Sequence, residues 1–339
     1  MASRIVARQR PHFANALRAT VFAAVLAGCT TSPAHDRSTA SAPTSSAATA
    51  SAPAIASAPI ETSSLTADAT ARGATVPASG ELPAGAVVPD SVAGSNERVP
   101  FVLLLHGYGG NGASIARHFG FPALARARKF IYLAPDGVKD SKNARFWNAG
   151  EACCDFDHAG PDHVAELGRV IAQARSSRLV DPSRIFVVGY SNGGFMAHRL
   201  ACDVEGIAGI GSVAGSVSFD PSACKNAPLS IVQVHGDADP VVHFDGGYVL
   251  GRTNVARHAG AFEGIRQWAH RLGCDATAAR GPKFDLDPAI AGLETEPSTF
   301  SCAPGVAFLR VAGGEHDIAS EPSSMARVLE LVMSGAKGP

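Results

Sequence analysis

The sequence predicts an α/β protein in which a mostly parallel sheet lies between two layers of helices. Two observations carry this prediction. Short apolar runs without polar alternation recur after residue 99, as in strands that are buried on both faces. Helix-like stretches separate these runs, and strand alternating with helix implies parallel strands joined by crossover connections. We therefore expect a three-layer α/β sandwich.

The expected strands are apolar runs bounded by turn residues. They cover residues 101–105, 130–133, 185–188, 207–213, 229–234 and 306–311. The expected helices cover residues 114–129, 162–177, 193–202, 260–272 and 323–333. We find no internal repeat, and a strand before residue 99 is hard to locate.

The first 28 residues have the layout of a secretory signal. Four arginines precede a short apolar stretch at residues 19–27, and small residues follow it. The run Leu26-Ala27-Gly28-Cys29 matches the bacterial lipobox, in which the cysteine is acylated and becomes the first residue. An ordinary signal peptide that ends near a cysteine is the alternative. We expect lipid on Cys29 to anchor the protein without a spanning helix.

Residues 29–80 are expected to form a tether. This segment is mostly Ala, Ser, Thr and Pro, and it has few charges and almost no large apolar side chains. Such a chain cannot bury enough apolar surface to offset the entropy of ordering. The predicted organisation is a signal peptide (1–28), the acylated cysteine and tether (29–80), and a folded α/β domain (81–339).

The cysteine count fits an oxidising compartment. Six cysteines remain besides Cys29, namely Cys153, Cys154, Cys202, Cys224, Cys274 and Cys302. We expect Cys202 to pair with Cys224 and Cys274 with Cys302, because each pair closes a loop of modest length. The state of the adjacent Cys153 and Cys154 stays open. Zinc is the competing interpretation, but no Cys-x-x-Cys spacing is present, so we expect no metal.

Charge and hydropathy exclude two classes of partner. A formal net charge of −1 provides no basic field for nucleic acid or for an anionic membrane surface. The body contains no apolar run of eighteen residues that could span a membrane. We expect no cofactor either.

Polar and glycine residues follow each predicted strand, where parallel sheets gather their functional groups. These exits read His106-Gly107-Tyr108-Gly109-Gly110, Asp136-Gly137, Gly189-Tyr190-Ser191-Asn192-Gly193, His235-Gly236-Asp237-Ala238-Asp239 and Gly313-Gly314-Glu315-His316.

The run around Ser191 predicts a catalytic nucleophile. Gly189-x-Ser191-x-Gly193 follows an apolar strand and precedes a helix, which is the strand–turn–helix context of a nucleophile elbow. The flanking glycines are needed because side chains there would clash in so sharp a turn. The alternative is a glycine-rich turn whose serine caps the helix.

A serine hydroxyl needs a base, and a base needs an orienting acid. In α/β-hydrolases the chain order is Ser, Asp or Glu, then His. His316 follows the last strand and is the expected base. Asp237 and Asp239 both qualify as the acid by position. We favour Asp239 and expect Asp237 to brace the turn.

The reaction also needs donors for the oxyanion. We expect the backbone N–H of Asn192, which starts the helix after Ser191, to be one of them. The second is expected from the loop after the first strand, at the N–H of Tyr108. His106 and Gly107 are interpreted as structural.

The combined motifs resemble the polyhydroxybutyrate depolymerase and feruloyl/acetylxylan esterase group of the α/β-hydrolases, including its lipoprotein members. They are Leu-Leu-His-Gly-Tyr-Gly-Gly, Phe-Trp-Asn-Ala-Gly with Cys-Cys, Gly-Tyr-Ser-Asn-Gly-Gly-Phe-Met-Ala and His-Gly-Asp-Ala-Asp-Pro-Val-Val. The resemblance covers residues 99–333. It implies the triad Ser191, Asp239 and His316, and it implies that Trp147 and Asp162 shape or brace the site. We also place Trp147 and Tyr190 in the substrate pocket.

Two positions depart from the pattern of that group. Asp317-Ile318-Ala319 follow His316, whereas the group usually has an aromatic residue and a proline there, and the aromatic tends to line the acyl pocket. The second acid of the usual Asp-Asp-Val is His163 here.

We therefore expect an exported serine esterase that hydrolyses short-chain hydroxyalkanoate polyesters or oligomers by an acyl-enzyme mechanism. Feruloyl or acetylxylan esters of plant polysaccharide are the alternative substrates. A catalytically silent binding lipoprotein and a peptidase related to the prolyl oligopeptidases are the rival functions. The expected location is the cell envelope, at the outer membrane or the periplasmic face, or outside the cell. The expected partners are the ester and the membrane that holds Cys29.

Overall fold

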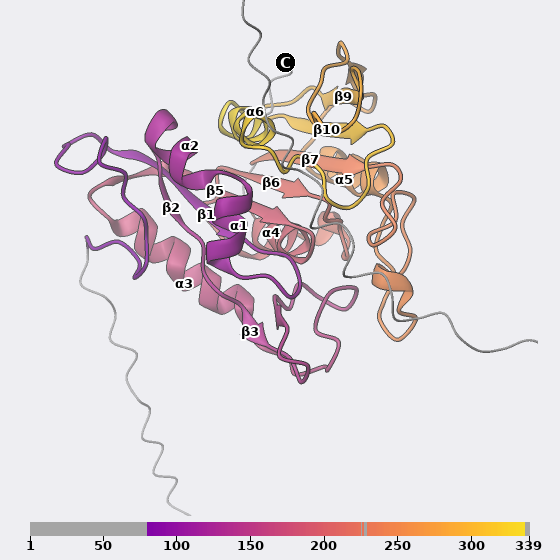
Figure 1. Ribbon diagram of the computed structural model, residues 1–339, viewed down its shortest axis with the longest axis horizontal. Helices are drawn as coiled ribbons and strands as arrows, with labels where there is room; N and C mark the ends of the chain where they lie inside the picture. Colours follow the sequence, from indigo (N-terminus) through magenta and orange to yellow (C-terminus); the bar gives the residue numbers. More distant parts are fainter. Residues whose placement is uncertain (1–79, 225, 227–228, 336–339) are drawn as a thin grey trace, which may run out of the picture. The chain divides into compact units, whose positions relative to one another are not determined.

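The central element of the structure is an eight-stranded sheet with helices on both faces (Figure 1). The computed structural model describes residues 80–335 apart from residues 225, 227 and 228. The predicted signal peptide, Cys29 and the tether up to residue 79 lie outside the described residues. No helix within the described residues is long and apolar enough to cross a membrane.

The strands and helices alternate for most of the described chain. In chain order they are β1 (Val99–Leu105), α1 (Gly112–His118), α2 (Phe121–Arg128), β2 (Ile131–Leu133), β3 (Val138–Lys139), β4 (Arg145–Phe146), α3 (His163–Ser176), β5 (Val180–Tyr190), α4 (Asn192–Asp203), β6 (Gly209–Val213), β7 (Ser230–Gly236), α5 (Ala261–Arg271), β8 (Ala279–Arg280), β9 (Thr295–Phe300), β10 (Val306–Val311) and α6 (Pro322–Met333). Two 3-10 turns, Pro221–Ala223 and Val249–Gly251, lie in the loops.

The order of strands in the sheet is β2-β1-β5-β6-β7-β10-β9-β8. The six strands from β2 to β10 are mutually parallel, whereas β9 and β8 complete the edge in antiparallel register. The chain passes from β1 outward to β2 and then returns to β5 on the other side of β1. The direction of winding therefore reverses between β1 and β5, and ligands bind at such switch points, beyond the carboxyl ends of the strands.

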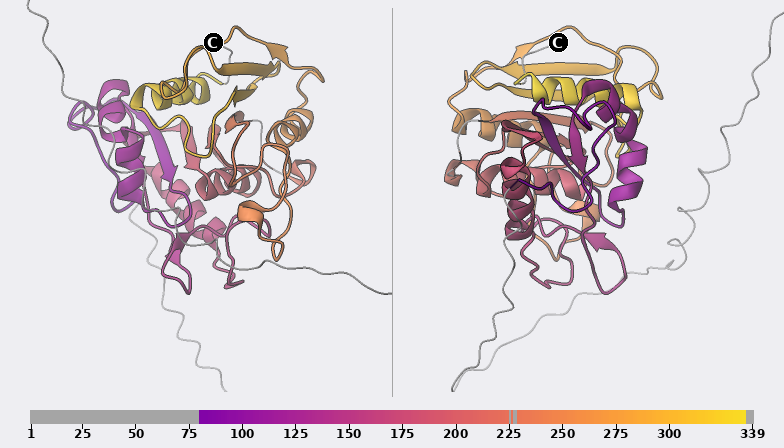
Figure 2. Two further views of the ribbon diagram at one scale, coloured as in Figure 1. Left: turned by 45° about the vertical axis from the view of Figure 1, so that its right-hand side comes forward. Right: turned by 90° about the vertical axis from the view of Figure 1, so that its left-hand side faces the viewer.

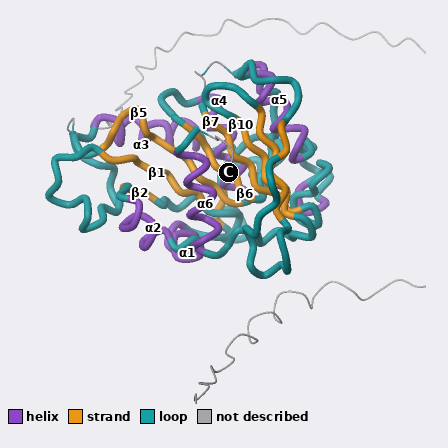
Figure 3. The backbone as a smooth tube through the Cα atoms, turned by 90° about the horizontal axis from the view of Figure 1, so that it is seen from above, coloured by secondary structure: helices purple, strands orange, loops and turns teal. Residues whose placement is uncertain are grey.

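Burial of the strands on both faces explains their unbroken apolar character. In β1, Phe101, Leu103 and Leu105 pack into the core that α3, α4 and α5 cover. The alternate residues Val102 and Leu104 pack into the core that α1, α2 and α6 cover. Figure 3 shows these helices on opposite sides of the strands. The predicted three-layer α/β sandwich is confirmed.

The last helix, α6, packs against the helices that follow β1. Helix α6 contacts α2 across the outer layer, and the right-hand view of Figure 2 shows α6, in yellow, beside the purple helices. A β-carbon on Gly120, between α1 and α2, would lie 2.7 Å from Pro322 at the start of α6. This close approach fixes where the first helical region must turn.

Three expectations about the elements need correction. Residues 114–129 form two helices rather than one, because Gly120 adopts a left-handed φ of 63° and Pro122 lies in the first turn of the second helix. Strand β9, Thr-Glu-Pro-Ser-Thr-Phe, was not expected, since its sequence is polar and contains proline. In place of a strand before residue 99, Val87 forms an isolated antiparallel bridge to Tyr132.

The two expected disulfides are present, joining Cys202 to Cys224 and Cys274 to Cys302. Cys153 and Cys154, whose state the sequence left open, form a third disulfide between neighbouring residues. That pair is buried and lies against the start of α4, because the side-chain amide of Asn192 donates to Cys153 Sγ over 3.5 Å.

Candidate active site

Ser191 lies in the sharp turn between β5 and α4. Its backbone has φ 52° and ψ −117°, a left-handed conformation that non-glycine residues rarely adopt. A hydrogen bond from its N–H to the carbonyl oxygen of Val213 on β6 holds the turn at 2.8 Å. The turn therefore presents the hydroxyl at the carboxyl edge of the sheet.

The residues around Ser191 must be glycines because the backbone there lies very close to neighbouring strands. A β-carbon on Gly193 would overlap the carbonyl oxygen of Leu105 at the end of β1. One on Gly189 would overlap the backbone of Gly193 itself, and one on Gly194 would lie 2.7 Å from Ser212 Oγ. The elbow thus packs directly on β1 and β6, and no side chain fits between them.

Three polar side chains, each from a segment that follows a different strand, are connected by hydrogen bonds. Nε2 of His316 lies 2.9 Å from Oγ of Ser191, and Nδ1 of His316 lies 2.8 Å from Oδ2 of Asp239. Asp239 follows β7, and His316 lies in the loop after β10. Although 125 residues separate Ser191 from His316, the parallel sheet brings their side chains to one edge.

The carboxylate of Asp239 is fixed from several sides. Its Oδ1 accepts hydrogen bonds from the N–H groups of Val241 and Val242 at 2.8 and 2.9 Å. Burial raises the pKa of Asp239, but the hydrogen bond to His316 and these backbone donors outweigh it, so the pKa lies below its usual value. The group is therefore ionised at neutral pH and can orient the imidazole of His316.

A second histidine, His235, lies next to the same carboxylate. Its Nε2 is 2.8 Å from the carbonyl oxygen of Val242 and 3.5 Å from Oδ2 of Asp239. The side chain is fully buried, and desolvation lowers its pKa. His235 therefore packs as a neutral imidazole beneath the acid.

Asp237 has a structural position, but it does not brace its own turn through the local backbone bond that the sequence predicted. Its Oδ1 accepts from the N–H of Gly313 at 2.7 Å, and its Oδ2 pairs with Arg310 at 2.6 Å. Both partners belong to β10 or the loop that carries His316. Asp237 therefore braces this loop and does not contact the imidazole.

Two backbone donors lie next to Ser191 without an internal partner. Within the described part of the chain, neither the N–H of Tyr108 nor that of Asn192 donates a hydrogen bond to another residue. Tyr108 follows Gly107, where a β-carbon would be 3.2 Å from Cβ of Ser191. Asn192 is the first residue of α4, where the helix leaves its N–H groups unsatisfied. The two positions are those expected of oxyanion donors.

The prediction that Trp147 lines the substrate pocket needs correction, because its side chain is fully buried. Its Nε1 donates to the carbonyl oxygen of His106 at 3.0 Å. Its backbone N–H donates to Oδ1 of Asn192 at 2.7 Å, and Nδ2 of Asn192 donates back to its carbonyl. Trp147 therefore braces the loop after β1 against the start of α4.

Asp162 caps a helix, whereas Tyr190 lies beside Ser191. Asp162 caps α3, since its Oδ1 accepts from the N–H of Ala165 at 2.9 Å. Tyr190 is partly exposed beside the nucleophile, its ring centroid is 5.4 Å from that of His316, and its hydroxyl donates to the His316 carbonyl at 3.3 Å. Tyr190 also lines a cavity that opens next to Ser191. The geometry thus leaves Tyr190, and not Trp147, in contact with open space.

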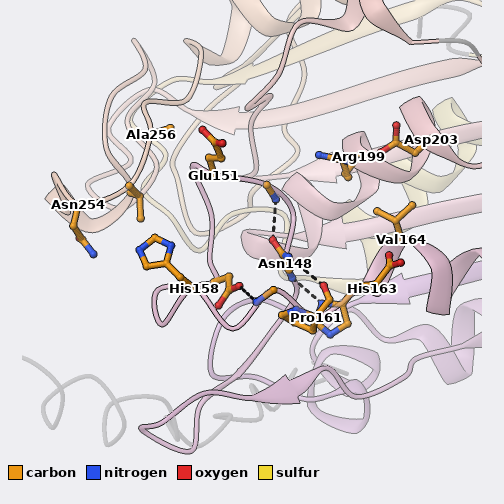
Figure 4. A pocket seen from close by; sticks show the side chains of 15 residues that line it. Asn148, Glu151, His158, Pro161, His163, Val164, Arg199, Asp203, Asn254 and Ala256 are labelled. Carbon is orange, nitrogen blue, oxygen red and sulfur yellow. Dashed lines mark hydrogen bonds and ion pairs between the residues drawn. The ribbon is translucent and has the colours of Figure 1, made fainter. Parts of the chain in front are cut away.

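A larger cavity of about 980 Å³ lies between the loop before α3 and the second half of α4 (Figure 4). Most of its polar groups already have partners. Asp155 accepts from the N–H groups of Ala159 and Gly160, and Arg199 pairs with Asp203. These side chains hold the wall of the cavity together, so we do not assign the chemistry to it. Across the described residues, no group of three His, Cys, Asp or Glu side chains is arranged to hold a metal ion.

Comparison with known proteins relates this chain to esterases. Residues 89–256 match the model of the phospholipase/carboxylesterase family. The esterase NocK of Nocardia uniformis subsp. tsuyamanensis is 33% identical over 150 residues, which are 43% of this chain and 42% of NocK. Feruloyl esterase C of Emericella nidulans is 28% identical over 219 residues, covering 63% of this chain and 68% of that protein. The chain thus spans less than half of NocK and about two thirds of feruloyl esterase C.

Among solved structures, the acetyl xylan esterase from Aspergillus awamori superposes with a TM-score of 0.47 at 15% identity, covering 68% of this chain and 87% of that one.

Proposed function

We propose that this chain is an esterase of the α/β-hydrolase superfamily and that it hydrolyses carboxylic esters with Ser191, His316 and Asp239 as its catalytic triad. One observation carries the proposal: His316 lies within hydrogen-bond distance of both the Ser191 hydroxyl and the Asp239 carboxylate. This is the relationship that a base and its orienting acid require.

In the acylation step, Nε2 of His316 takes the proton from Ser191 as Oγ attacks the ester carbonyl. Asp239 holds the imidazole with its proton on Nδ1 and stabilises the imidazolium that forms. The negative oxygen of the tetrahedral intermediate accepts hydrogen bonds from the N–H groups of Tyr108 and Asn192. His316 then gives its proton to the leaving alkoxide, and the acyl group remains on Ser191.

In the deacylation step, water takes the place of the alcohol. His316 removes a proton from the water as its oxygen attacks the acyl-enzyme, and the same two backbone donors hold the second oxyanion. Collapse of this intermediate returns the proton to Ser191 Oγ and releases the acid. The preset φ of Ser191 and the firm bracing of Asn192 by Trp147 keep these groups in place between the steps.

For the substrate, we propose hydroxycinnamoyl or related acyl esters of polysaccharide ahead of hydroxyalkanoates. Relatives that match over two thirds of this chain are named feruloyl esterase C. Hydroxyalkanoate oligomers are the second candidate, which the motifs shared with polyhydroxybutyrate depolymerases support. Both need the same acyl chemistry, and only the fit of the acyl group distinguishes them.

Turnover of a small ester panel tests the proposal. Wild type and Ser191→Ala should be assayed on short p-nitrophenyl esters, methyl ferulate, acetylated xylan and hydroxybutyrate oligomers. We expect wild-type turnover on at least one ester and a loss of roughly 10⁴-fold or more in Ser191→Ala. Binding of these esters without any turnover would instead favour a silent binding protein. A Ser191→Ala variant that hydrolyses the esters at the wild-type rate would contradict the role of Ser191 as nucleophile.

For the location, we propose export followed by lipid anchoring, with a tether between Cys29 and a catalytic domain that begins near residue 81. The lipobox-like run 26–29 and the low-complexity segment after it support this proposal. Metabolic labelling with a fatty acid should label wild type and not Cys29→Ala. Unlabelled wild type that is released from cells would contradict the anchor.

A further inference from the structure

A separate cavity of about 550 Å³ lies between α5 and the antiparallel edge of the sheet. Helix α5 packs on β7 and β10, and β9 and β8 lie beyond these strands. Glu296, Ser298 and Phe300 alternate along β9 and therefore face the cavity together. Phe262 and Arg266, one turn apart on α5, also line it. None of the residues around this cavity belongs to the proposed triad or lines the smaller cavity next to the nucleophile.

Four phenylalanine rings provide the apolar surface of this cavity. The ring centroid of Phe262 lies 6.0 Å from that of Phe300 and 5.4 Å from that of Phe308, and Phe308 lies 6.0 Å from Phe244. Phe300 and Phe308 are buried, whereas Phe262 is 37% exposed. Aromatic rings pack on one another edge to face or in offset stacks. The exposed ring of Phe262 therefore offers a contact for one more aromatic ring.

Positively charged side chains surround these rings. Arg266, Arg280, Lys283 and Arg310 line the cavity, and Glu296 is the single carboxylate among its described lining residues. Nζ of Lys283 lies 2.5 Å from Oε1 of Glu296, and Nη1 of Arg310 lies 3.4 Å from its Oε2. Lys283 holds the pKa of Glu296 below its usual value, and Arg310 and Arg280 add to this effect. One carboxylate is thus shared by three cations.

The cation that has no close partner is Arg280. Arg266 pairs with Glu263 at 2.8 Å and Arg310 pairs with Asp237 at 2.6 Å, whereas Arg280 forms no ion pair with any residue that the structure describes. The side chain of Lys283, next to it in the lining, is 55% exposed. A guanidinium presents N–H donors in a planar fork that matches a carboxylate. The cavity therefore combines an apolar aromatic surface with a cation that can take a further anion.

We propose that this cavity is a binding site for an aromatic carboxylate, whose ring packs against Phe262 and whose carboxylate pairs with Arg280 and Lys283. A sugar would leave its hydroxyl groups unpaired against the phenylalanine rings, and a small inorganic anion would not use the rings. An aromatic carboxylate uses both kinds of group. The proposal concerns a site apart from the triad and does not depend on the esterase function.

Titration calorimetry of the full-length chain with 3-phenylpropanoate tests the proposal. We expect a Kd of about 0.1–1 mM, which is usual for a ligand of this size. Binding should weaken by about threefold or more between about 50 and about 500 mM NaCl, because the cations are exposed and salt screens them. Neutral 3-phenylpropanol should bind at least about fivefold more weakly, and 3-cyclohexylpropanoate, which lacks the aromatic ring, about threefold more weakly.

The double variant Arg280→Gln with Lys283→Gln tests the cations. Both side chains are exposed, so circular dichroism should show the wild-type fold. We expect the Kd for 3-phenylpropanoate to rise about tenfold and its salt dependence to weaken. Arg169→Gln with Lys142→Gln removes the same two charges at exposed positions elsewhere and should keep the wild-type Kd.

The variant Phe262→Ser tests the aromatic contact. It removes the exposed ring and leaves the buried rings of Phe300 and Phe308 in place. We expect the Kd for 3-phenylpropanoate to rise about fivefold. Leu293→Ser, which changes an exposed apolar side chain outside the lining of the cavity, is the matched control and should bind as wild type does.

The site is overturned if 3-phenylpropanoate does not bind by about 10 mM, or if it binds with the same Kd to wild type and to both sets of variants. Equal binding of 3-phenylpropanol would contradict the role of the cations. Equal binding of 3-cyclohexylpropanoate would contradict the role of the aromatic ring. Ester turnover is measured separately, so a failure of this site and a failure of the esterase proposal are distinguishable.

Discussion

The imidazole of His316 and the carboxylate of Asp239 are joined by a hydrogen bond of 2.8 Å between Nδ1 and Oδ2. They come from loops after two neighbouring parallel strands, β10 and β7. The sheet register therefore sets this distance. A change that leaves the register intact but alters the acid should act on catalysis rather than on folding.

Replacing Asp239 by asparagine is the first such change. The amide keeps the shape but can direct its NH₂ group at Nδ1, which favours the tautomer of His316 that cannot accept a proton from Ser191. We expect kcat to fall by roughly 10³- to 10⁴-fold, with the folded structure retained by circular dichroism. Asp237→Asn is the matched control, and its loss should be below about tenfold. Equal losses would mean that the acid is misassigned.

The glycines of the elbow should be intolerant of any side chain. Gly193→Ala would force a methyl group into the Leu105 carbonyl, so we expect little soluble protein or a fall in Tm of many degrees. Gly168→Ala, inside helix α3, places its methyl 3.5 Å from Val204, an ordinary contact. It should stabilise the fold by about 0.5–1 kcal/mol. Thermal unfolding of both variants checks the contrast, which an unaffected Gly193→Ala would contradict.

Buried His198 should make the protein sensitive to acid. Desolvation lowers its pKa from 6.5 to about 4, so the unfolded chain binds a proton that the folded chain rejects between these values. Its stabilising effect is complete above pH 6.5 and is lost as the pH falls toward 4. In urea unfolding at pH 7, 6 and 5, His198→Gln should reduce the slope of the unfolding free energy by up to about 1.4 kcal/mol per pH unit below pH 6.5. An unchanged slope would show that His198 does not titrate in this way.

The disulfide between Cys202 and Cys224 ties the end of α4 to the loop before β7. Its sequence separation of 22 residues predicts a loss of about 3 kcal/mol when both cysteines are replaced by serine. Urea unfolding measures the loss, and peptide mapping without reductant verifies the pairing. A mapped bond between Cys202 and any other cysteine would contradict the structure.

The elements that the sequence predicted well are those whose pattern is local. The run Gly189–Gly193 indicates a sharp turn by its composition alone, and the strand before it is apolar because both faces are buried. The order of Ser191, Asp239 and His316 along the chain is the one that α/β-hydrolases use. Their meeting at one edge follows from parallel strands.

The features that the sequence did not predict depend on distant partners. The break at Gly120 is set by the close approach of Pro322, about 200 residues away. Strand β9 forms because β10 offers an unpaired edge, despite its own polar sequence. Trp147 looked like a pocket residue, but its hydrogen bonds to His106 and Asn192 place it inside the core. A signal for this was available in principle, since an indole needs a partner for its N–H when it is buried.

Covalent labelling of the nucleophile tests the central claim most directly. The protein should be incubated with a fluorophosphonate, which phosphonylates activated serines, and the site mapped by peptide mass spectrometry. We predict one adduct per chain, on Ser191, with no labelling of Ser191→Ala and slow labelling of Asp239→Asn. Labelling of Ser191→Ala at the wild-type rate, or an adduct on another residue, would contradict the assignment of Ser191 as the nucleophile.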